Sequence, residues 1–118
     1  MIERIELENS CFKNIDRSDY DNHIKSIWYF NSKNKWHRSN GPAKIYYYDN
    51  GKIYSEHYCI NGVRHRLDGP VYIAYKGSGE IYFKEYCING KEYSEEEFEK
   101  ESKRLKNIER NLKLLDKK

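Results

Sequence analysis

The sequence lacks any apolar run of membrane-spanning length, and its first ten residues, MIERIELENS, lack the apolar stretch of a signal peptide. Its three cysteines are an odd number and form no CxxC pair, so neither a disulfide framework nor a zinc site is expected. We therefore expect a soluble, cytoplasmic protein of a reducing compartment that contacts no membrane and holds no metal or cofactor.

Apolar residues are scarce, since they make up 37% of the 118 residues while charged residues make up 35%. A chain of this length is expected to form a single domain with a modest core. Twelve tyrosines supply much of the apolar area. Because tyrosine buries its ring while its hydroxyl stays near water, this composition favours a thin, half-exposed sheet over a deep globular centre.

The net charge of +3 is small and unevenly spread. Residues 1–26 carry four basic and six acidic side chains, residues 27–90 carry nine and five, and residues 91–118 carry nine and eight. The middle of the chain is thus the basic part, but a dedicated nucleic-acid-binding protein has a denser basic stripe. A protein that mimics nucleic acid would be strongly acidic, so that class is excluded.

An internal repeat with a period of 28 residues dominates the sequence. Between residues 37–62 and 65–90, 14 of 26 positions are identical without a gap, which indicates two copies of one structural unit. The longest matches are His37-Arg38 with His65-Arg66, Gly41-Pro42 with Gly69-Pro70, and residues 58–62 with 86–90. Residues 28–36 resemble the tail of an earlier unit, in which Phe30 takes the position of Tyr58.

Each unit is predicted to contain two strands joined by turns rich in glycine and asparagine. The strands are expected over 43–48 and 53–60, and again over 71–75 and 81–88, because β-branched and aromatic residues fill these runs. The dipeptides at 61–62 and 89–90 are both Asn-Gly, which favours tight hairpin turns. Alternation assigns two faces: a core face with Ala43, Ile45, Tyr47, Val71, Ile73 and Tyr75, and an opposite face with Tyr46, Tyr48 and Tyr72.

A C-terminal helix is predicted to follow the repeats. Ser94 and Glu97 have the spacing of a capping box, and Phe98, Leu105, Ile108, Leu112 and Leu115 form one apolar stripe. We expect the helix to cap the last repeat, with docking on a partner or a membrane as the alternative. The predicted fold is mainly β (α+β): an antiparallel β-hairpin repeat meander with a capping helix, in one domain of an N-terminal segment (1–27), repeats (28–93) and helix (94–118).

The string NGVRHRLDGPVYIAYKGSGEIYFKEYCINGKEYSEEEF resembles the MORN-like repeat proteins of phages, giant viruses and bacteria, whose units follow the pattern NG-x-x-HR-x-DGPA. The resemblance covers roughly residues 28–100, and Val71 departs from the usual alanine. Most members of this family have no assigned function. By analogy with other small phage proteins of lysine-rich composition, the resemblance implies an inhibitor of host defence, such as an anti-CRISPR protein.

Catalysis and metal binding find little support in the sequence. His37-Arg38 and His65-Arg66 could act as acid, base and phosphate clamp on a phosphodiester, but recurrence at one repeat position favours a structural role in the turns. The histidines (His23, His37, His57 and His65) show no metal-ligand spacing, and Cys59 and Cys87 are expected to pack as small hydrophobes. We expect no enzymatic activity.

Two binding functions remain. In the first, the protein binds RNA or a nucleotide: bases stack on aromatic side chains while basic side chains hold the phosphates. The candidate residues for this function are Trp36, Lys44, Tyr46, Tyr48, Arg64, Arg66, Tyr72 and Lys76. In the second, which we favour, a host protein or ribonucleoprotein such as a CRISPR effector docks on the aromatic residues, because positions that differ between units are free to serve a partner. The predicted partner-binding residues are Trp28, Trp36, Tyr46, Tyr48, Arg64, Arg66, Tyr72 and Phe83.

Overall fold

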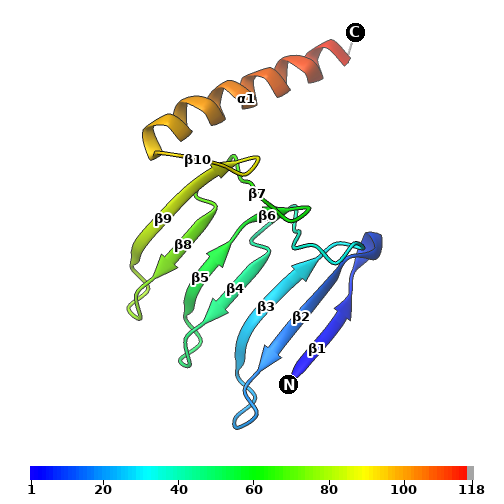
Figure 1. Cartoon of the computed structure of the whole chain (residues 1–118), viewed down its shortest axis with the longest axis vertical. Coiled ribbons are helices and arrows are strands. Elements are labelled where there is room, and N and C mark those ends of the chain that lie inside the picture. Colours follow the sequence, from blue (N-terminus) through cyan, green and yellow to red (C-terminus); the bar gives the residue numbers. More distant parts are fainter. Residues whose placement is uncertain (117–118) are drawn as a thin grey trace.

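The computed structural model describes residues 1–116 and shows a mainly β protein with one C-terminal α-helix, as predicted. Eight strands form one antiparallel sheet in the order β1-β2-β3-β4-β5-β8-β9-β10, and β6 pairs with β7 in a separate short hairpin. Figure 1 shows the strands side by side in one layer with α1 beyond β10. The elements are β1 (Ile2–Glu6), a 3-10 turn (Glu8–Ser10), β2 (Phe12–Arg17), β3 (Ile24–Phe30), β4 (Lys44–Tyr47), β5 (Ile53–His57), β6 (Cys59–Ile60), β7 (Val63–Arg64), β8 (Tyr72–Tyr75), β9 (Ile81–Ile88), β10 (Lys91–Tyr93) and α1 (Glu95–Asp116).

In three hairpins of the sheet the strands pair in equivalent registers. The hairpins β2–β3, β4–β5 and β8–β9 each contain a β-bulge, which follows Asp16, Tyr46 and Ala74 respectively. The residue before each of these is an isoleucine whose side chain is buried: Ile15, Ile45 and Ile73. The hairpin β2–β3 is therefore a first unit of the array, and most of it lies in the N-terminal segment, before residue 28, where the sequence repeat becomes recognisable.

Tyr29, rather than Phe30, occupies the position of Tyr58, which corrects the sequence alignment of the first unit. The backbone N–H of Tyr29 donates to the carbonyl of Ala43 at 2.7 Å, as that of Tyr58 donates to Val71 at 2.8 Å. Phe30 instead bridges to Trp36, as Cys59 pairs with Arg64. Five residues (31–35) separate Phe30 from Trp36, whereas four residues (60–63) separate Cys59 from Arg64. The first unit therefore contains a one-residue insertion, which shifts the alignment of the residues before it.

The buried residues agree with the predicted core face, with one difference. Ala43, Ile45, Val71 and Ile73 are buried, as are Cys59 and Cys87. Tyr47 and Tyr75, assigned to the same face, are only half-buried. They lie next to the bulges, at the ends of β4 and β8.

The first turns of α1 cap the sheet as predicted. The Ser94 hydroxyl accepts a hydrogen bond from the Glu97 N–H (3.2 Å) and donates one to the Glu97 carboxylate (2.9 Å), so Ser94 is the helix N-cap. Phe98 is buried against Tyr86, with ring centres 4.8 Å apart. The predicted helical segment ran to residue 118, and residues 117–118 lie outside the described residues. Within residues 1–116, no helix is long and apolar enough to cross a membrane.

Candidate functional site

One face of the sheet carries most of the residues that were predicted to bind a partner. Side chains that lie directly opposite each other in an antiparallel sheet point to the same face. The strand registers therefore place two rows on this face, which we call the aromatic face: Asn14, Trp28, Lys44, His57, Tyr72 and Glu85 in one row, and Asp16, Ser26, Tyr46, Ser55, Ala74 and Phe83 in the other.

Rings from five strands form a continuous line across the aromatic face. The distances between ring centres are 6.4 Å from Trp28 to Tyr46, 5.8 Å from Tyr46 to His57, 4.6 Å from His57 to Tyr72 and 5.9 Å from Tyr72 to Phe83. Trp36 joins the line at 6.5 Å from Trp28. Most of these contacts are edge to face, a favourable geometry for aromatic pairs.

Small residues between the rings allow this packing. Ser26, Ser55 and Ala74 share a row with Tyr46 and Phe83, and all three are buried although they point out of a single-layer sheet. Neighbouring rings cover them because they offer no bulk of their own. The aromatic face is thus a compact surface of packed rings, and not a set of independent exposed side chains.

The cations of the aromatic face are already engaged within the protein. The Lys44 ammonium lies 3.7 Å from the centre of the Trp36 ring, and burial lowers the pKa of Lys44. Arg64 bonds to the carboxylates of Glu85 (3.2 Å) and Glu92 (3.4 Å). On this face the Lys44 ammonium is held against a ring and the Arg64 guanidinium against two carboxylates, an arrangement that suits a protein partner better than a polyanion.

His57 is held neutral in the middle of the line. Burial, followed by the positive charges of Lys44 and Arg64, lowers its pKa from 6.5 to about 4. Its ring lies between those of Tyr46 and Tyr72. At neutral pH the imidazole therefore acts as a further packed ring and adds no charge to the face.

Acidification is expected to destabilise the fold through His57. Between pH 6.5 and about 4 the unfolded chain binds a proton at this histidine that the folded protein excludes, so stability falls as the pH is lowered through that window. The loss should reach about 2 kcal/mol at pH 4.5. Urea unfolding at pH 7 and pH 4.5 measures it, with His57→Phe as the control that removes this part of the pH dependence. An equal pH dependence in the two proteins would contradict a neutral His57.

Two buried polar atoms of the aromatic face have no hydrogen-bond partner: Asn14 Oδ1 and Trp28 Nε1. Asn14 and Trp28 face each other across β2 and β3. An unpaired buried polar group lowers folding stability by about 1–3 kcal/mol. At this end of the aromatic face the sheet thus leaves two polar atoms without a hydrogen bond.

The repeated His-Arg pairs hold the turns of their own units. The Nδ1 atoms of His37 and His65 accept hydrogen bonds from the backbone N–H groups of Asn61 (2.9 Å) and Asn89 (3.0 Å). The two histidines line different hollows of the surface. Because each imidazole is tied to a backbone turn in the same way, the geometry supports the structural interpretation.

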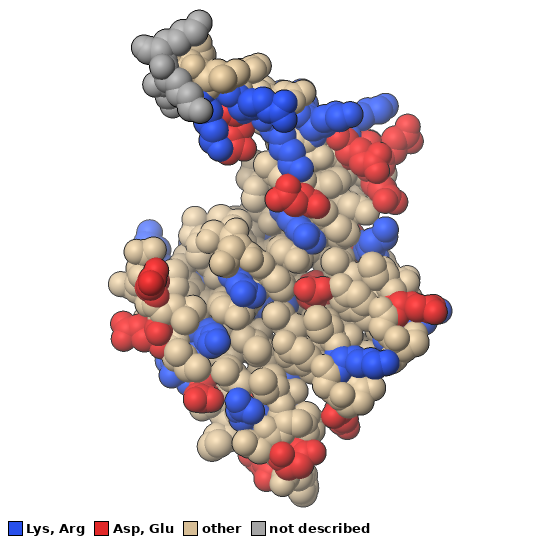
Figure 2. Space-filling model, turned by 180° about the vertical axis from the view of Figure 1, so that it is seen from behind, with Lys and Arg blue, Asp and Glu red and all other residues tan. Residues whose placement is uncertain are grey.

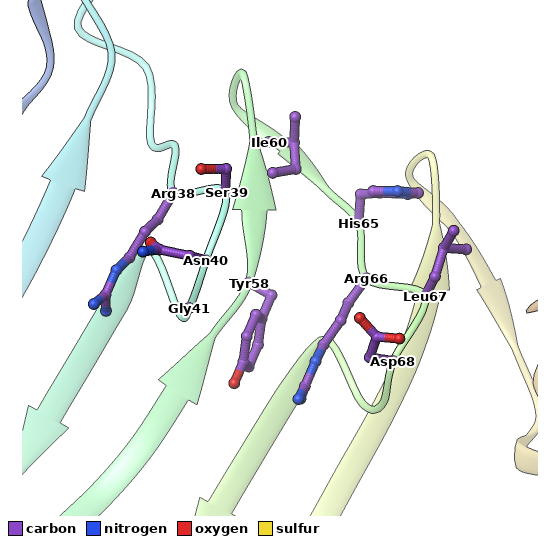
Figure 3. A pocket seen from close by; sticks show the side chains of 10 residues that line it. All are labelled: Arg38, Ser39, Asn40, Gly41, Tyr58, Ile60, His65, Arg66, Leu67 and Asp68. Carbon is purple, nitrogen blue, oxygen red and sulfur yellow. The ribbon is translucent and has the colours of Figure 1, made fainter. Parts of the chain in front are cut away.

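The arginines of these pairs lie on the face opposite the aromatic line. The Arg38 guanidinium stacks 4.0 Å from the centre of the Tyr29 ring, and Arg66 stacks 3.9 Å from Tyr58. Each also donates to the carbonyl of the proline four residues on, at 3.3 and 2.9 Å. Figure 3 shows Arg38, Tyr58 and Arg66 extended side by side in the same direction.

Six of the eight predicted partner-binding residues belong to one surface: Trp28, Trp36, Tyr46, Arg64, Tyr72 and Phe83. Arg66 lies on the opposite face, and Tyr48 lies beyond the end of β4 with its hydroxyl bonded to the carbonyl of Tyr75 (2.8 Å). The predicted partner-binding residues did not include His57, because it belongs to no recognisable binding motif. Its alternation with Ser55 on β5 could have placed it on this face.

The chain matches no family model, no curated protein and no solved structure. Among residues 1–116, no group of three or more His, Cys, Asp or Glu side chains is placed to hold a metal ion. The MORN-like resemblance stays a prediction.

Proposed function

We propose that this chain is a non-enzymatic binding protein that docks another protein on its aromatic face. The line of rings from Trp28 to Phe83 is the observation that carries the proposal. Interface centres are enriched in tyrosine, tryptophan and arginine, and a few such anchors supply most of the binding free energy. Rings that already pack together lose little side-chain entropy on binding, which makes this face a pre-organised anchor.

Protein is favoured over RNA as the partner for two reasons. Bases stack on ring faces, whereas these rings mostly contact one another edge to face, and phosphates need free cations, whereas Lys44 and Arg64 are engaged. In addition, Lys and Arg are interspersed with Asp and Glu on the side of the molecule seen in Figure 2. RNA or nucleotide binding remains the second candidate, supported by the number of aromatic and basic residues in the repeats.

The identity of the partner is a narrower proposal. The MORN-like resemblance points to a phage or mobile element, and hence to a host macromolecule as the target. Within that class, a CRISPR effector ribonucleoprotein is the target that we name. The inhibitor would act by stoichiometric occupation of a surface, which needs no catalytic residues.

Site-specific photo-crosslinking tests the proposal with two neighbouring positions of β9. Phe83 belongs to the aromatic face and is 42% exposed, while Lys84 points to the opposite face with its side chain 39% exposed. A photoreactive amino acid at position 83, incubated with bacterial extract, is expected to form one dominant protein adduct. The same group at position 84 should not form that adduct.

A nuclease treatment before irradiation separates the two candidate functions. An adduct at position 83 that survives nuclease supports a protein partner. An adduct that disappears, or that contains nucleotides, supports RNA binding. Equal adducts at positions 83 and 84 would overturn the assignment of the binding face.

A further inference from the structure

A hollow of about 600 Å³ lies between the His-Arg turns of the two later repeat units. Residues 38–41 of one unit and residues 65–68 of the next line it, together with Tyr58, and we call it the turn hollow. Figure 3 shows the Tyr58 hydroxyl and the guanidinium groups of Arg38 and Arg66 directed the same way. The volume of the turn hollow is in the range of sites that bind small molecules.

The two guanidinium groups of the turn hollow have no carboxylate partner in the described part of the chain. Among residues 1–116, arginines form ion pairs at positions 17, 64 and 104. Neither Arg38 nor Arg66 has a described carboxylate within ion-pair distance. Each donates one N–H group to a proline carbonyl, whereas a guanidinium has five N–H groups. Because buried charges are normally paired, these half-buried guanidiniums retain both charge and donors for an anion.

The two units differ in the residue that lies two positions after the arginine. Asn40 occupies this position in one unit and Asp68 in the next, and both line the turn hollow. The Asp68 carboxylate bonds to Lys106 at 2.9 Å. The hydrogen bond and charge of Lys106, and then the charge of Arg66, lower the pKa of Asp68. Asn40 supplies no such negative charge beside Arg38.

The turn hollow therefore carries a surplus of positive charge. Two arginines line it against one aspartate, and that aspartate is already bonded to a lysine. Ser39, Asn40 and Tyr58 add side chains that can donate hydrogen bonds. Guanidinium groups match the geometry of phosphate oxygens. A phosphate monoester carries a charge of about −1.5 to −2 at pH 7, which fits two guanidiniums better than the single charge of a carboxylate.

We propose that the turn hollow binds the phosphate monoester group of a small molecule, with Arg38 as the main ligand and Asn40, Tyr58 and Arg66 around it. Arg38 keeps its place in the turn, because the anion uses the N–H groups that the Pro42 carbonyl leaves free. The arginines lie on the face opposite the line of rings, so this site is separate from the proposed protein interface.

Titration of the full chain with inorganic phosphate tests the site. The ionic strength is held constant with chloride, and the Nε–H signals of the arginines are followed by nuclear magnetic resonance. The Arg38 signal is expected to shift until it saturates, whereas the Arg64 signal should not, since Glu85 and Glu92 already bind that guanidinium. A shift of Arg38 that never saturates, or that chloride alone reproduces, would overturn the proposal.

Two substitutions of the same chemical type separate the site from general charge effects. Asn40→Asp puts a carboxylate beside Arg38 and should weaken phosphate binding by about tenfold. The turn should still form, because the next unit carries Asp68 at this position. Asn50→Asp is the control: Asn50 lies beyond the other end of β4, where its Oδ1 accepts from the Lys52 N–H at 2.9 Å, as an aspartate can. It should bind like the unaltered protein, and equal affinities of the two variants would contradict the proposed site.

A converse substitution and a second probe complete the test. Asp68→Asn removes the negative charge from the turn hollow and should strengthen phosphate binding several-fold, so weaker binding would contradict the proposal. Dimethyl phosphate carries one charge, like the phosphodiesters of RNA, and should bind at least tenfold more weakly than inorganic phosphate. Equal binding of the two probes would reject the monoester and favour a nucleic-acid backbone as the ligand.

Discussion

Replacement of Arg66 by alanine is expected to lower the free energy of unfolding by about 2–3 kcal/mol. The guanidinium stacks on Tyr58 and donates to the carbonyl of Pro70 at 2.9 Å in a half-buried site. A stacked cation contributes about 0.5–2 kcal/mol, and a hydrogen bond from a charged group about 1.5–3 kcal/mol, with partial compensation by water after the substitution. The measurement is urea unfolding at pH 7, monitored by circular dichroism.

Arg64→Ala is the matched control for Arg66→Ala. Arg64 is two residues away and pairs with Glu85 and Glu92 on a more exposed surface, where ion pairs contribute about 0–1 kcal/mol. Arg66→Lys should recover little of the lost stability, because a lysine ammonium lacks the planar group that stacks on Tyr58. A loss below 0.5 kcal/mol for Arg66→Ala, on the order of ordinary surface substitutions, would mean that the repeated His-Arg pairs do not hold the turns.

The same contact explains why glycine and proline recur with the arginine. A Cβ atom at Gly69 would lie 3.0 Å from Arg66 Cζ, and one at Gly41 would lie 2.9 Å from Arg38 Cζ. The proline that follows each glycine supplies the carbonyl that the arginine binds. The repeated residues His-Arg-x-x-Gly-Pro, at 37–42 and 65–70, therefore form one packed turn in each of the two units.

The fold was predictable from the sequence wherever the two later units share residues. Identical letters at equivalent positions specified the turns and the face of Ile45 and Ile73. The first hairpin could not be recognised in the sequence because it shares Ile15 and Ile24 but few other residues with the later units. In addition, the insertion in residues 31–35 interrupts the 28-residue spacing. The strands of this hairpin still pair in the same register, because backbone hydrogen bonds do not depend on which side chains are present.

The candidate site was predictable in part, for a related reason. Positions on the face opposite the aromatic line repeat from unit to unit, as Ile15, Ile45 and Ile73 show, since they are buried in the core. Positions on the aromatic face vary: serine, serine and phenylalanine occupy equivalent places on β3, β5 and β9. The expectation that variable positions serve a partner thus placed Phe83 correctly on the aromatic face. Arg66 repeats as Arg38, and by the same expectation it belongs with the structural residues.

Replacement of Tyr72 by alanine is expected to weaken partner binding by about 2 kcal/mol, or roughly thirtyfold, which is typical of a central aromatic anchor. Tyr72 joins His57 to Phe83, so its loss would separate Phe83 from the other rings of the line. Binding of the partner identified by crosslinking would be measured by calorimetry.

The control for Tyr72→Ala is Tyr20→Ala, since Tyr20 is fully exposed at the turn between β2 and β3, away from the ring line. It should bind like the unaltered protein. Unfolding curves of both variants separate lost contacts from lost folding, and a Tyr72→Ala protein that is folded and binds with unchanged affinity would remove the ring line from the interface. Because the rings also support one another, a Phe83→Ala change on top of Tyr72→Ala should cost less than the sum of the two single losses.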